Sequence, residues 1–379
     1  MARKKPIKTN AVKRKDGLNK SNQAITPVKA LVLLSGGLDS RLVVKMLEKQ
    51  LGKPNVEAVF FALPFGGGCC SDRFCVLNFT AKQAIKLHIV DCTKGRMFRE
   101  YMDIIRKPRF QRGTAMNPCI DCHLFMLKEA KKLAKKTGAS IIATGEVLGE
   151  RPLSQHKWAM TLIEKEAGLI GKVLRPLSAK LLPETEAEKK GWINRKRLLD
   201  IQGRRRVRQI SLARKYKIDF PTPGGGCVLT DKQFSKRLVN LLDYKDKQGK
   251  QEPSPTEIEL LKLGRHFRQA KSIIVVGRNE KENGMILQLA KKIKPKKGKD
   301  GSGAVKPVAI LEVIDHMGPT TLVLNPSQAA LRAAARLTVR YADAPVRKPV
   351  KVGIRIARKT SRVIDAKALP KHEIEKMRV

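Results

Sequence analysis

Ten residues near the start of the chain combine a strand pattern with a turn that suits phosphate. Residues 31–40 read LVLLSGGLDS, and the apolar residues that follow repeat at helical spacing. In a strand–turn–helix unit, the turn amides and the positive end of the helix dipole attract an anion, and glycine lets the backbone approach it closely. We therefore expect Ser35, Gly36 and Gly37 to cradle a phosphate group.

Two polar residues complete this turn. Asp39 and Ser40 stand at the start of the expected helix, where they can bind a metal ion, hold phosphate or cap the helix. The spacing differs from the GxxxxGK[ST] loop of kinases and GTPases. The alternative interpretation is an ordinary strand–helix turn with a polar cap.

Three cysteines have the spacing of a soft-metal or sulfur site. Cys119 and Cys122 form a CxxC at the expected start of a helix, and Cys227 follows in a glycine-rich segment. A helix N-terminus lowers the pKa of a thiol, so we expect thiolates there. Three thiolates would hold a [4Fe–4S] cluster with one iron open. Zinc, with His or water as fourth ligand, and a persulfide-carrying cysteine pair are the alternatives; the adjacent His123 is badly directed for the same ion.

The other four cysteines carry weaker signals. Cys69, Cys70 and Cys75 lie in and after a Gly-rich loop that follows the second strand, and they form a sulfur relay, a further metal site or a surface loop. Cys92 has no partner pattern, so we expect it in the core. With seven cysteines in all, a disulfide framework is not indicated.

Alternating apolar segments position these residues on a parallel α/β sheet. We expect strands at 31–34, 56–63, 87–91 and 139–145, with helices near 77–87 and 120–137, the latter ending at Gly138. Ligands of such sheets bind at the carboxyl ends of the strands, so the loops after Leu34, Leu63, Asp91 and Thr144 should surround one site. A smaller α+β domain is indicated by strands at 272–277, 308–314 and 320–325 and by helices near 280–292 and 326–337.

The charge predicts a polyanionic partner. The chain of 379 residues has 79 Lys and Arg against 34 Asp and Glu, a net charge of +45, and only 4% aromatic residues. We expect RNA phosphate contacts rather than base stacking, with Arg204, Arg205, Arg206 and Arg208 among them; a solvated basic face is the alternative. No apolar run is long enough to span a membrane and no signal peptide is evident, so we expect a cytoplasmic protein without a membrane partner.

Composition also predicts the domain boundaries. We expect a disordered basic tail at 1–28, a large domain at 29–243, a polar linker at 244–256, the small domain at 257–345 and a basic C-terminal tail at 346–379.

Longer motifs resemble a known family. SGGLDS resembles the loop of the PP-loop (N-type) ATP pyrophosphatases, and residues 117–155 (NPCIDCHLFMLKEAKKLAKKTGASIIATGEVLGERPLSQ) resemble the PP-loop tRNA thiouridylases. Residues 174–185 (LRPLSAKLLPET), 203–206 and 223–231 (PGGGCVLTD) resemble a branch described as 4-thiouridine-synthetase-like. The resemblance implies a Rossmann-like (HUP-type) fold. One departure is Gly145–Glu146, where the 2-thiouridylases have Gly-His, so the roles of that loop do not carry over.

A second, shorter resemblance concerns the C-terminal domain. Residues 263–268 (LGRHFR) and 275–283 (VVGRNEKEN) resemble the small RNA-binding domain of ribosome-associated quality-control factors. The alternative is a packing or oligomerisation module.

The resemblances imply ATP-dependent tRNA uridine thiolation. They carry ATP onto Ser35, Gly36, Gly37, Asp39 and Ser40, with Mg²⁺ near Asp39. Catalytic roles fall on Asp39, Cys119, Cys122 and Cys227, with the three cysteines as ligands of the iron–sulfur cluster. The sulfur donor would be sulfide or a cysteine desulfurase-type protein. A PP-loop ligase that adenylates a carboxylate, and a non-catalytic RNA- or ribosome-binding protein, are the alternatives.

Overall fold

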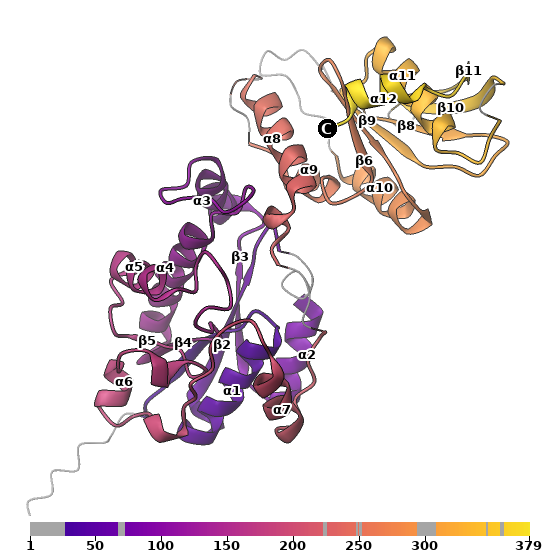
Figure 1. Cartoon of the computed structure of the whole chain (residues 1–379). Helices are drawn as coiled ribbons and strands as arrows, with labels where there is room; N and C mark the ends of the chain where they lie inside the picture. Colours follow the sequence, from indigo (N-terminus) through magenta and orange to yellow (C-terminus); the bar gives the residue numbers. More distant parts are fainter. Residues whose placement is uncertain are drawn as a thin grey trace, which may run out of the picture.

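The computed structural model describes residues 27–66, 73–222, 226–247, 249, 252–293, 308–345, 348–356 and 360–379. Most of the expected N-terminal tail, together with Cys69 and Cys70, lies outside these residues. Figure 1 shows two lobes, each built on its own sheet.

The first lobe contains a parallel five-stranded sheet, as predicted. Its strands lie in the order β3-β2-β1-β4-β5, all parallel. The strands are β1 (Ala30–Leu33), β2 (Val56–Ala62), β3 (Lys86–Asp91), β4 (Ile141–Thr144) and β5 (Val173–Leu174). The apolar run of β2 is buried along its whole length, as expected for a strand covered on both faces.

Helices cover both faces of this sheet and enclose two hydrophobic cores (Figure 1). One face carries α1 (Leu38–Leu51), α2 (Arg73–Gln83), α6 (Glu186–Lys189) and α7 (Val207–Lys215). The other face carries α3 (Gly95–Arg106), α4 (Cys119–Thr137) and α5 (Lys157–Ala167). Short 3₁₀ turns occupy Lys53–Asn55, Ala179–Leu181, Arg195–Arg197 and Val228–Thr230. The predicted end of α4 is confirmed, because Gly138 adopts a left-handed φ of 73° there.

The second lobe is an antiparallel six-stranded sheet in the order β11-β10-β8-β9-β7-β6. Its strands are β6 (Arg265–Gln269), β7 (Ser272–Val276), β8 (Val308–Val313), β9 (Thr321–Leu324), β10 (Val350–Ile356) and β11 (Thr360–Ala366). Its helices are α10 (Glu280–Lys292), α11 (Gln328–Arg340) and α12 (Lys371–Met377). The smaller α+β domain is therefore present.

The structure corrects the expected basic tail at 346–379. This stretch contains β10, β11 and α12, and Val352, Ile354 and Ile374 contribute to the core of the second lobe. Alternate positions of β10, such as Lys351 and Arg355, are exposed. The basic residues therefore form the solvent side of a strand that is half buried.

The expected linker at 244–256 is also partly helical. Helix α8 (Lys232–Asp246) and the short α9 (Pro255–Leu260) occupy both ends of this stretch. Arg268 of β6 donates to the side-chain and main-chain oxygens of Asn240 at 2.8 and 2.9 Å, and Asn325 hydrogen-bonds Tyr244. Helix α8 therefore packs directly against the second sheet.

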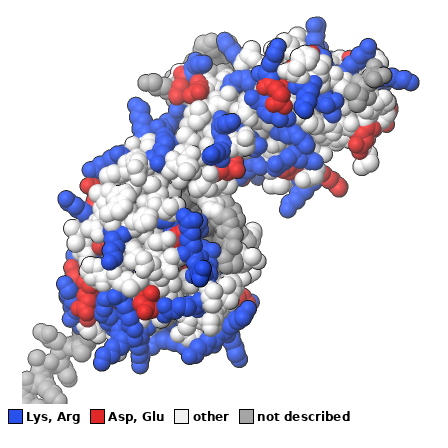
Figure 2. All heavy atoms as spheres, viewed as in Figure 1, with Lys and Arg blue, Asp and Glu red and all other residues white. Residues whose placement is uncertain are grey.

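No helix within the described ranges has the length and apolar character that a membrane crossing requires. Figure 2 shows Lys and Arg spread over the visible face of both lobes, with Asp and Glu in scattered spots.

A buried histidine makes the second lobe sensitive to acid. His266 is 4% exposed, and its Nε2 lies 2.8 Å from the Leu263 carbonyl oxygen. Burial, reinforced by the charge of Arg237, lowers the pKa of His266 to about 4. The unfolded chain binds this proton from about pH 6.5 downward, so stability is complete above that pH and declines as the pH falls toward 4.

We expect this residue to remove on the order of 2 kcal/mol of unfolding free energy between pH 7 and pH 4.5. Urea denaturation of the full chain at several pH values measures the loss. His266→Gln is the matched control, because glutamine does not titrate. The variant should lose less unfolding free energy between pH 7 and pH 4.5 than the wild type, by about 2 kcal/mol. Equal slopes for the two proteins would contradict the assignment.

Candidate active site

A cavity of about 350 Å³ opens at the carboxyl ends of β1, β2 and β4, the edge predicted from the sequence. Its lining includes Ser35, Leu63 and Thr144, so three of the four expected loops contribute. The start of α4 and the segment around Cys227 form another part of the wall. The cavity therefore brings together motifs that lie up to about two hundred residues apart in the sequence.

The glycine-rich turn adopts a compact form that closes on itself. Gly36 has a φ of 89°, which favours glycine, and the Gly37 amide donates to Ser35 Oγ at 3.3 Å. Ser40 Oγ donates to the Gly37 carbonyl at 3.0 Å. Beneath the turn, the buried Arg41 donates from Nε to the Gly36 carbonyl at 2.8 Å. This arginine fixes the turn from the protein side and leaves the opposite side to the cavity.

A second glycine sets how closely β4 approaches the turn. A Cβ atom on Gly145 would lie 2.6 Å from the amide nitrogen of Ser40. That distance is too short for real carbon atoms, so the start of α1 and the end of β4 can meet only because residue 145 has no side chain.

Asp39 belongs to a small group of charges in the cavity wall. Its Oδ2 lies 3.9 Å from Nε of Arg206, which also pairs with Glu150. Burial and the nearby charge of Glu150 raise the pKa of Asp39 to about 6, although Arg206 opposes the shift. Asp39 Oδ1 is buried, the Gln209 side chain lowers the pKa of Asp39 as a hydrogen-bonding neighbour, and no contact of good hydrogen-bond geometry reaches Oδ1 within the described part of the chain. The site thus offers a carboxylate oxygen for a cation or a hydrogen-bond donor.

The three predicted thiols gather on one side of the cavity. Cys122 and Cys227 line it, and Cys119 is close enough for its charge to affect both. Tyr101 Oη lies 3.2 Å from Cys122 Sγ, and Cys227 Sγ lies 3.2 Å from the Phe65 carbonyl oxygen.

The expected thiolates are not found. Burial raises the pKa of all three thiols, that of Cys227 to about 11, and outweighs any effect of the helix N-terminus. Across the described ranges, no group of three or more His, Cys, Asp or Glu side chains stands close enough to hold a metal ion. The three thiols nevertheless fit an iron–sulfur cluster in number and chemistry, because such clusters are held by cysteine thiolates and metal binding displaces thiol protons.

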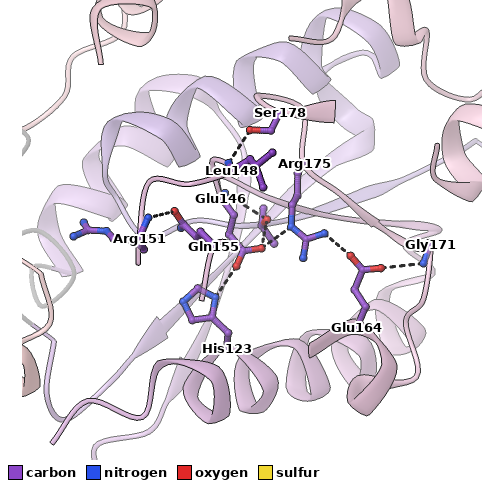
Figure 3. A network of polar contacts seen from close by, with 10 residues as sticks. His123, Glu146, Leu148, Arg151, Gln155, Glu164, Gly171, Arg175 and Ser178 are labelled. Atoms are coloured by element: carbon purple, nitrogen blue, oxygen red, sulfur yellow. Dashed lines mark hydrogen bonds and ion pairs between the residues drawn. The ribbon is translucent and has the colours of Figure 1, made fainter. Parts of the chain in front are cut away.

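A buried network of ionic side chains supports the cavity wall between the phosphate turn and the thiols (Figure 3). This network was not predicted from the sequence. Glu146 accepts from Arg175 Nε at 2.9 Å, and its other oxygen lies 2.7 Å from His123 Nδ1. Arg175 also pairs with Glu164. The Arg175 guanidinium and the His123 hydrogen bond hold the pKa of Glu146 well below its usual range despite burial. The network fixes His123, which lines the cavity directly after Cys122.

The four arginines predicted to bind RNA are divided between the protein surface and the cavity. The other predicted cysteines that the structure describes do not line the cavity. Arg204, Arg205 and Arg208 are exposed, and Arg208 pairs with Asp200 at 2.7 Å. Arg206 turns inward to the cavity. Cys75 lies on α2, where its Sγ is 2.8 Å from Nη2 of Arg41. Cys92 is fully buried, as expected.

Comparison with known proteins agrees with both resemblances. Residues 264–378 match the family model of the NFACT protein RNA binding domain. The chain is 34% identical over 128 residues to proteins named probable tRNA sulfurtransferase from Thermoanaerobacter sp. (strain X514) and Thermoanaerobacter pseudethanolicus (strain ATCC 33223 / 39E). The match covers 32% of this chain and spans only 30% of the length of those relatives.

Two solved structures overlap with the chain at low scores. The U34-tRNA thiolase NcsA from Methanococcus maripaludis, with its [4Fe-4S] cluster, is 18% identical and covers 62% of this chain and 70% of its own, with a TM-score of 0.31. The C-terminal part of the fibronectin/fibrinogen-binding protein from Streptococcus suis is 16% identical and covers 46% of this chain and 79% of its own, with a TM-score of 0.24. At these scores neither overlap carries weight for function. The sequence matches confirm both resemblances: the chain is similar to tRNA sulfurtransferases over 128 residues and, at 264–378, to the RNA-binding domain of NFACT proteins.

Proposed function

We propose that this protein catalyses ATP-dependent thiolation of a uridine in tRNA. The observation that carries the proposal is the shared cavity: the glycine-rich turn at 35–40 and the thiols of Cys122 and Cys227 border the same space. A phosphate cradle beside a group of thiols suits a reaction that first activates an oxygen and then replaces it by sulfur.

In this reaction, the phosphates of ATP lie on the turn formed by Ser35, Gly36, Gly37, Asp39 and Ser40, with Mg²⁺ near Asp39. The uridine carbonyl oxygen attacks the α-phosphorus, and the bond to pyrophosphate breaks. AMP is then attached to the ring carbon through that oxygen. Sulfur attacks the carbon, the carbon–oxygen bond breaks, and AMP leaves with the oxygen. The protein contributes positioning and charge neutralisation in the cradle.

Cys119, Cys122 and Cys227 would hold an iron–sulfur cluster in this proposal. When bound, such a cluster would supply an iron able to bind sulfide. The protein residues around it have separate tasks: Tyr101 would position Cys122 by donating its hydroxyl to the sulfur, and Cys227 would give up its hydrogen bond to the Phe65 carbonyl oxygen on losing its proton. A persulfide on Cys119 or Cys122, formed by transfer of sulfane sulfur from a desulfurase-type protein, is the alternative route, and sulfide serves as donor only for the cluster route.

Binding of tRNA would draw on the excess of basic residues. The exposed Arg204, Arg205 and Arg208 lie on the same lobe as the cavity, and the second lobe carries the segment similar to an RNA-binding domain. A basic surface that binds phosphates releases counterions, so tRNA affinity should fall steeply with salt concentration.

Product analysis tests this function against the two alternatives. Purified protein is incubated with Mg-ATP, with and without unmodified tRNA, and the nucleotides are separated by chromatography. Release of AMP and pyrophosphate that requires tRNA supports the proposal. Release without tRNA, driven by a carboxylate, would favour a ligase, and tRNA binding with no ATP cleavage would favour a non-catalytic RNA-binding protein.

A further inference from the structure

One arginine of the basic segment at 203–208 points away from solvent. Arg206 has a side chain that is 25% exposed and lines the cavity, whereas Arg204, Arg205 and Arg208 face outward. The backbone explains the difference. The Gly203 amide donates to the Leu148 carbonyl at 2.8 Å, which pins this segment beside the loop that carries Glu150.

Inside the cavity, Arg206 is held by carboxylates. It pairs with Glu150, whose side chain is 7% exposed, and it lies 3.9 Å from Asp39. Glu150 has a second cationic neighbour, because Nε of Arg151 lies 4.0 Å from the same carboxylate. Loss of Arg206 from this pair would therefore leave Glu150 close to one guanidinium.

Buried polar groups lie beside this pair. Gln209 is fully buried on α7, and its side chain is close enough to Asp39 to lower the pKa of that carboxyl through a hydrogen bond. Among the described residues, no contact of good hydrogen-bond geometry reaches Asp39 Oδ1 or the Gln209 amide atoms. Buried polar groups need hydrogen-bond partners, and a phosphate with its cation would supply them next to the phosphate turn.

We propose that Arg206 is a phosphate ligand. Before a nucleotide binds, its guanidinium pairs with Glu150 instead. A planar guanidinium binds phosphate oxygens in a bidentate manner, and phosphate competes with the carboxylate for the same N–H groups. When the nucleotide enters, Arg206 leaves Glu150 and binds its phosphates, while Asp39 and Glu150 become free to face the accompanying cation. Nucleotide and cation then favour each other's binding. This inference rests on the proposed function, because it takes the ligand of the turn to be ATP.

The inference predicts opposite effects for the two partners of the pair. Affinity for α,β-methylene ATP, which resists cleavage between these phosphates, is measured by calorimetry with Mg²⁺ and with EDTA. Arg206→Ala removes a charge-assisted contact and should weaken binding about 10- to 150-fold. Glu150→Gln removes the carboxylate that competes with phosphate for Arg206, so it should tighten binding of the analogue in EDTA about tenfold. It should also reduce the gain in affinity that Mg²⁺ gives.

Two further variants separate this effect from misfolding. Arg214→Ala changes an exposed arginine of α7, the helix that begins directly after Arg206, and should bind the analogue like the wild type. In the double variant Arg206→Ala/Glu150→Gln, loss of Glu150 should no longer tighten binding, because no guanidinium remains to be released. A Glu150→Gln chain that binds the analogue no more tightly than the wild type would overturn the proposed exchange of Arg206 between Glu150 and phosphate.

Filter binding of tRNA distinguishes nucleotide phosphate from RNA phosphate. Arg206→Ala should leave tRNA affinity unchanged, whereas Arg204→Ala/Arg205→Ala should lower it. An Arg206→Ala chain that loses tRNA affinity but keeps analogue affinity would overturn the inference and assign Arg206 to RNA. A wild-type chain that binds no analogue would contradict the proposed function itself. The proposed role of Arg206 would then fall with it.

Discussion

Replacement of Asp39 by Asn should reduce tRNA-dependent AMP release about 10²- to 10³-fold, the usual cost of removing one preorganised charge contact from an active site. The Asp39 carboxylate borders the cavity beside the phosphate turn, and among the described residues no contact of good hydrogen-bond geometry reaches its buried Oδ1. Asparagine keeps the shape but removes the negative charge. The variant therefore tests the charge rather than the packing.

The affinity of Asp39→Asn for tRNA should stay close to that of the wild type, because the side chain is only 16% exposed and RNA phosphates do not bind carboxylates. Asp103→Asn, an exposed carboxylate of α3, is the matched control and should change neither quantity. AMP is quantified by chromatography and tRNA affinity by filter binding. If Asp39→Asn lost tRNA affinity and AMP release in equal proportion, the residue would belong to RNA binding.

Replacement of Arg175 by Met should lower the free energy of unfolding by about 3–5 kcal/mol. The Arg175 side chain is 4% exposed and pairs with Glu146 and Glu164, which are themselves 8% and 13% exposed. Its removal leaves buried carboxylates without a cation. The loss should exceed that of any exposed ion pair, and urea denaturation measures it.

Two comparisons make this prediction specific. The double variant Arg175→Met/Glu146→Gln should regain part of the loss, because one of the uncompensated charges is also gone. Arg96→Met breaks an exposed pair with Glu100 on α3 and should cost less than about 1 kcal/mol. A double variant less stable than Arg175→Met would show that the network acts through packing rather than charge.

The sequence predicted the elements whose pattern is local. The apolar run of β2, the left-handed glycine after α4 and helix α10 at 280–292 all lie where periodicity and turn residues indicated. The pattern failed for β10, whose alternate Lys and Arg residues made the segment look like a tail. The strand is specified by its pairing with β8 and β11, which composition does not reveal.

The site was predictable in its motifs but not in its contacts. The SGGLDS turn and the cysteine spacing identified the cavity wall, yet four arginines in one basic segment look alike in the sequence. The pairing of Gly203 with Leu148, which lies far away in the sequence, brings this segment beside Glu150, with which Arg206 pairs. Likewise, the helix N-terminus indicated reactive thiolates, but burial, which depends on distant residues, raises the pKa of Cys119 and Cys122. The Glu146 network joins His123 of α4, Glu164 of α5 and one residue after each of β4 and β5, and its only sequence signal was the departure from Gly-His.

The most direct measurement of the central claim is a thionucleoside assay. Protein purified without oxygen and treated with iron and sulfide is incubated with unmodified tRNA, Mg-ATP and sulfide, and the digested tRNA is analysed by mass spectrometry. We predict a thiouridine peak that requires ATP and disappears in Cys227→Ala, whereas Cys92→Ala, which changes a buried cysteine that is not among the residues lining the cavity, retains it. A tRNA that stays unmodified, from protein that holds iron and binds tRNA but cleaves no ATP, would contradict the thiolation function.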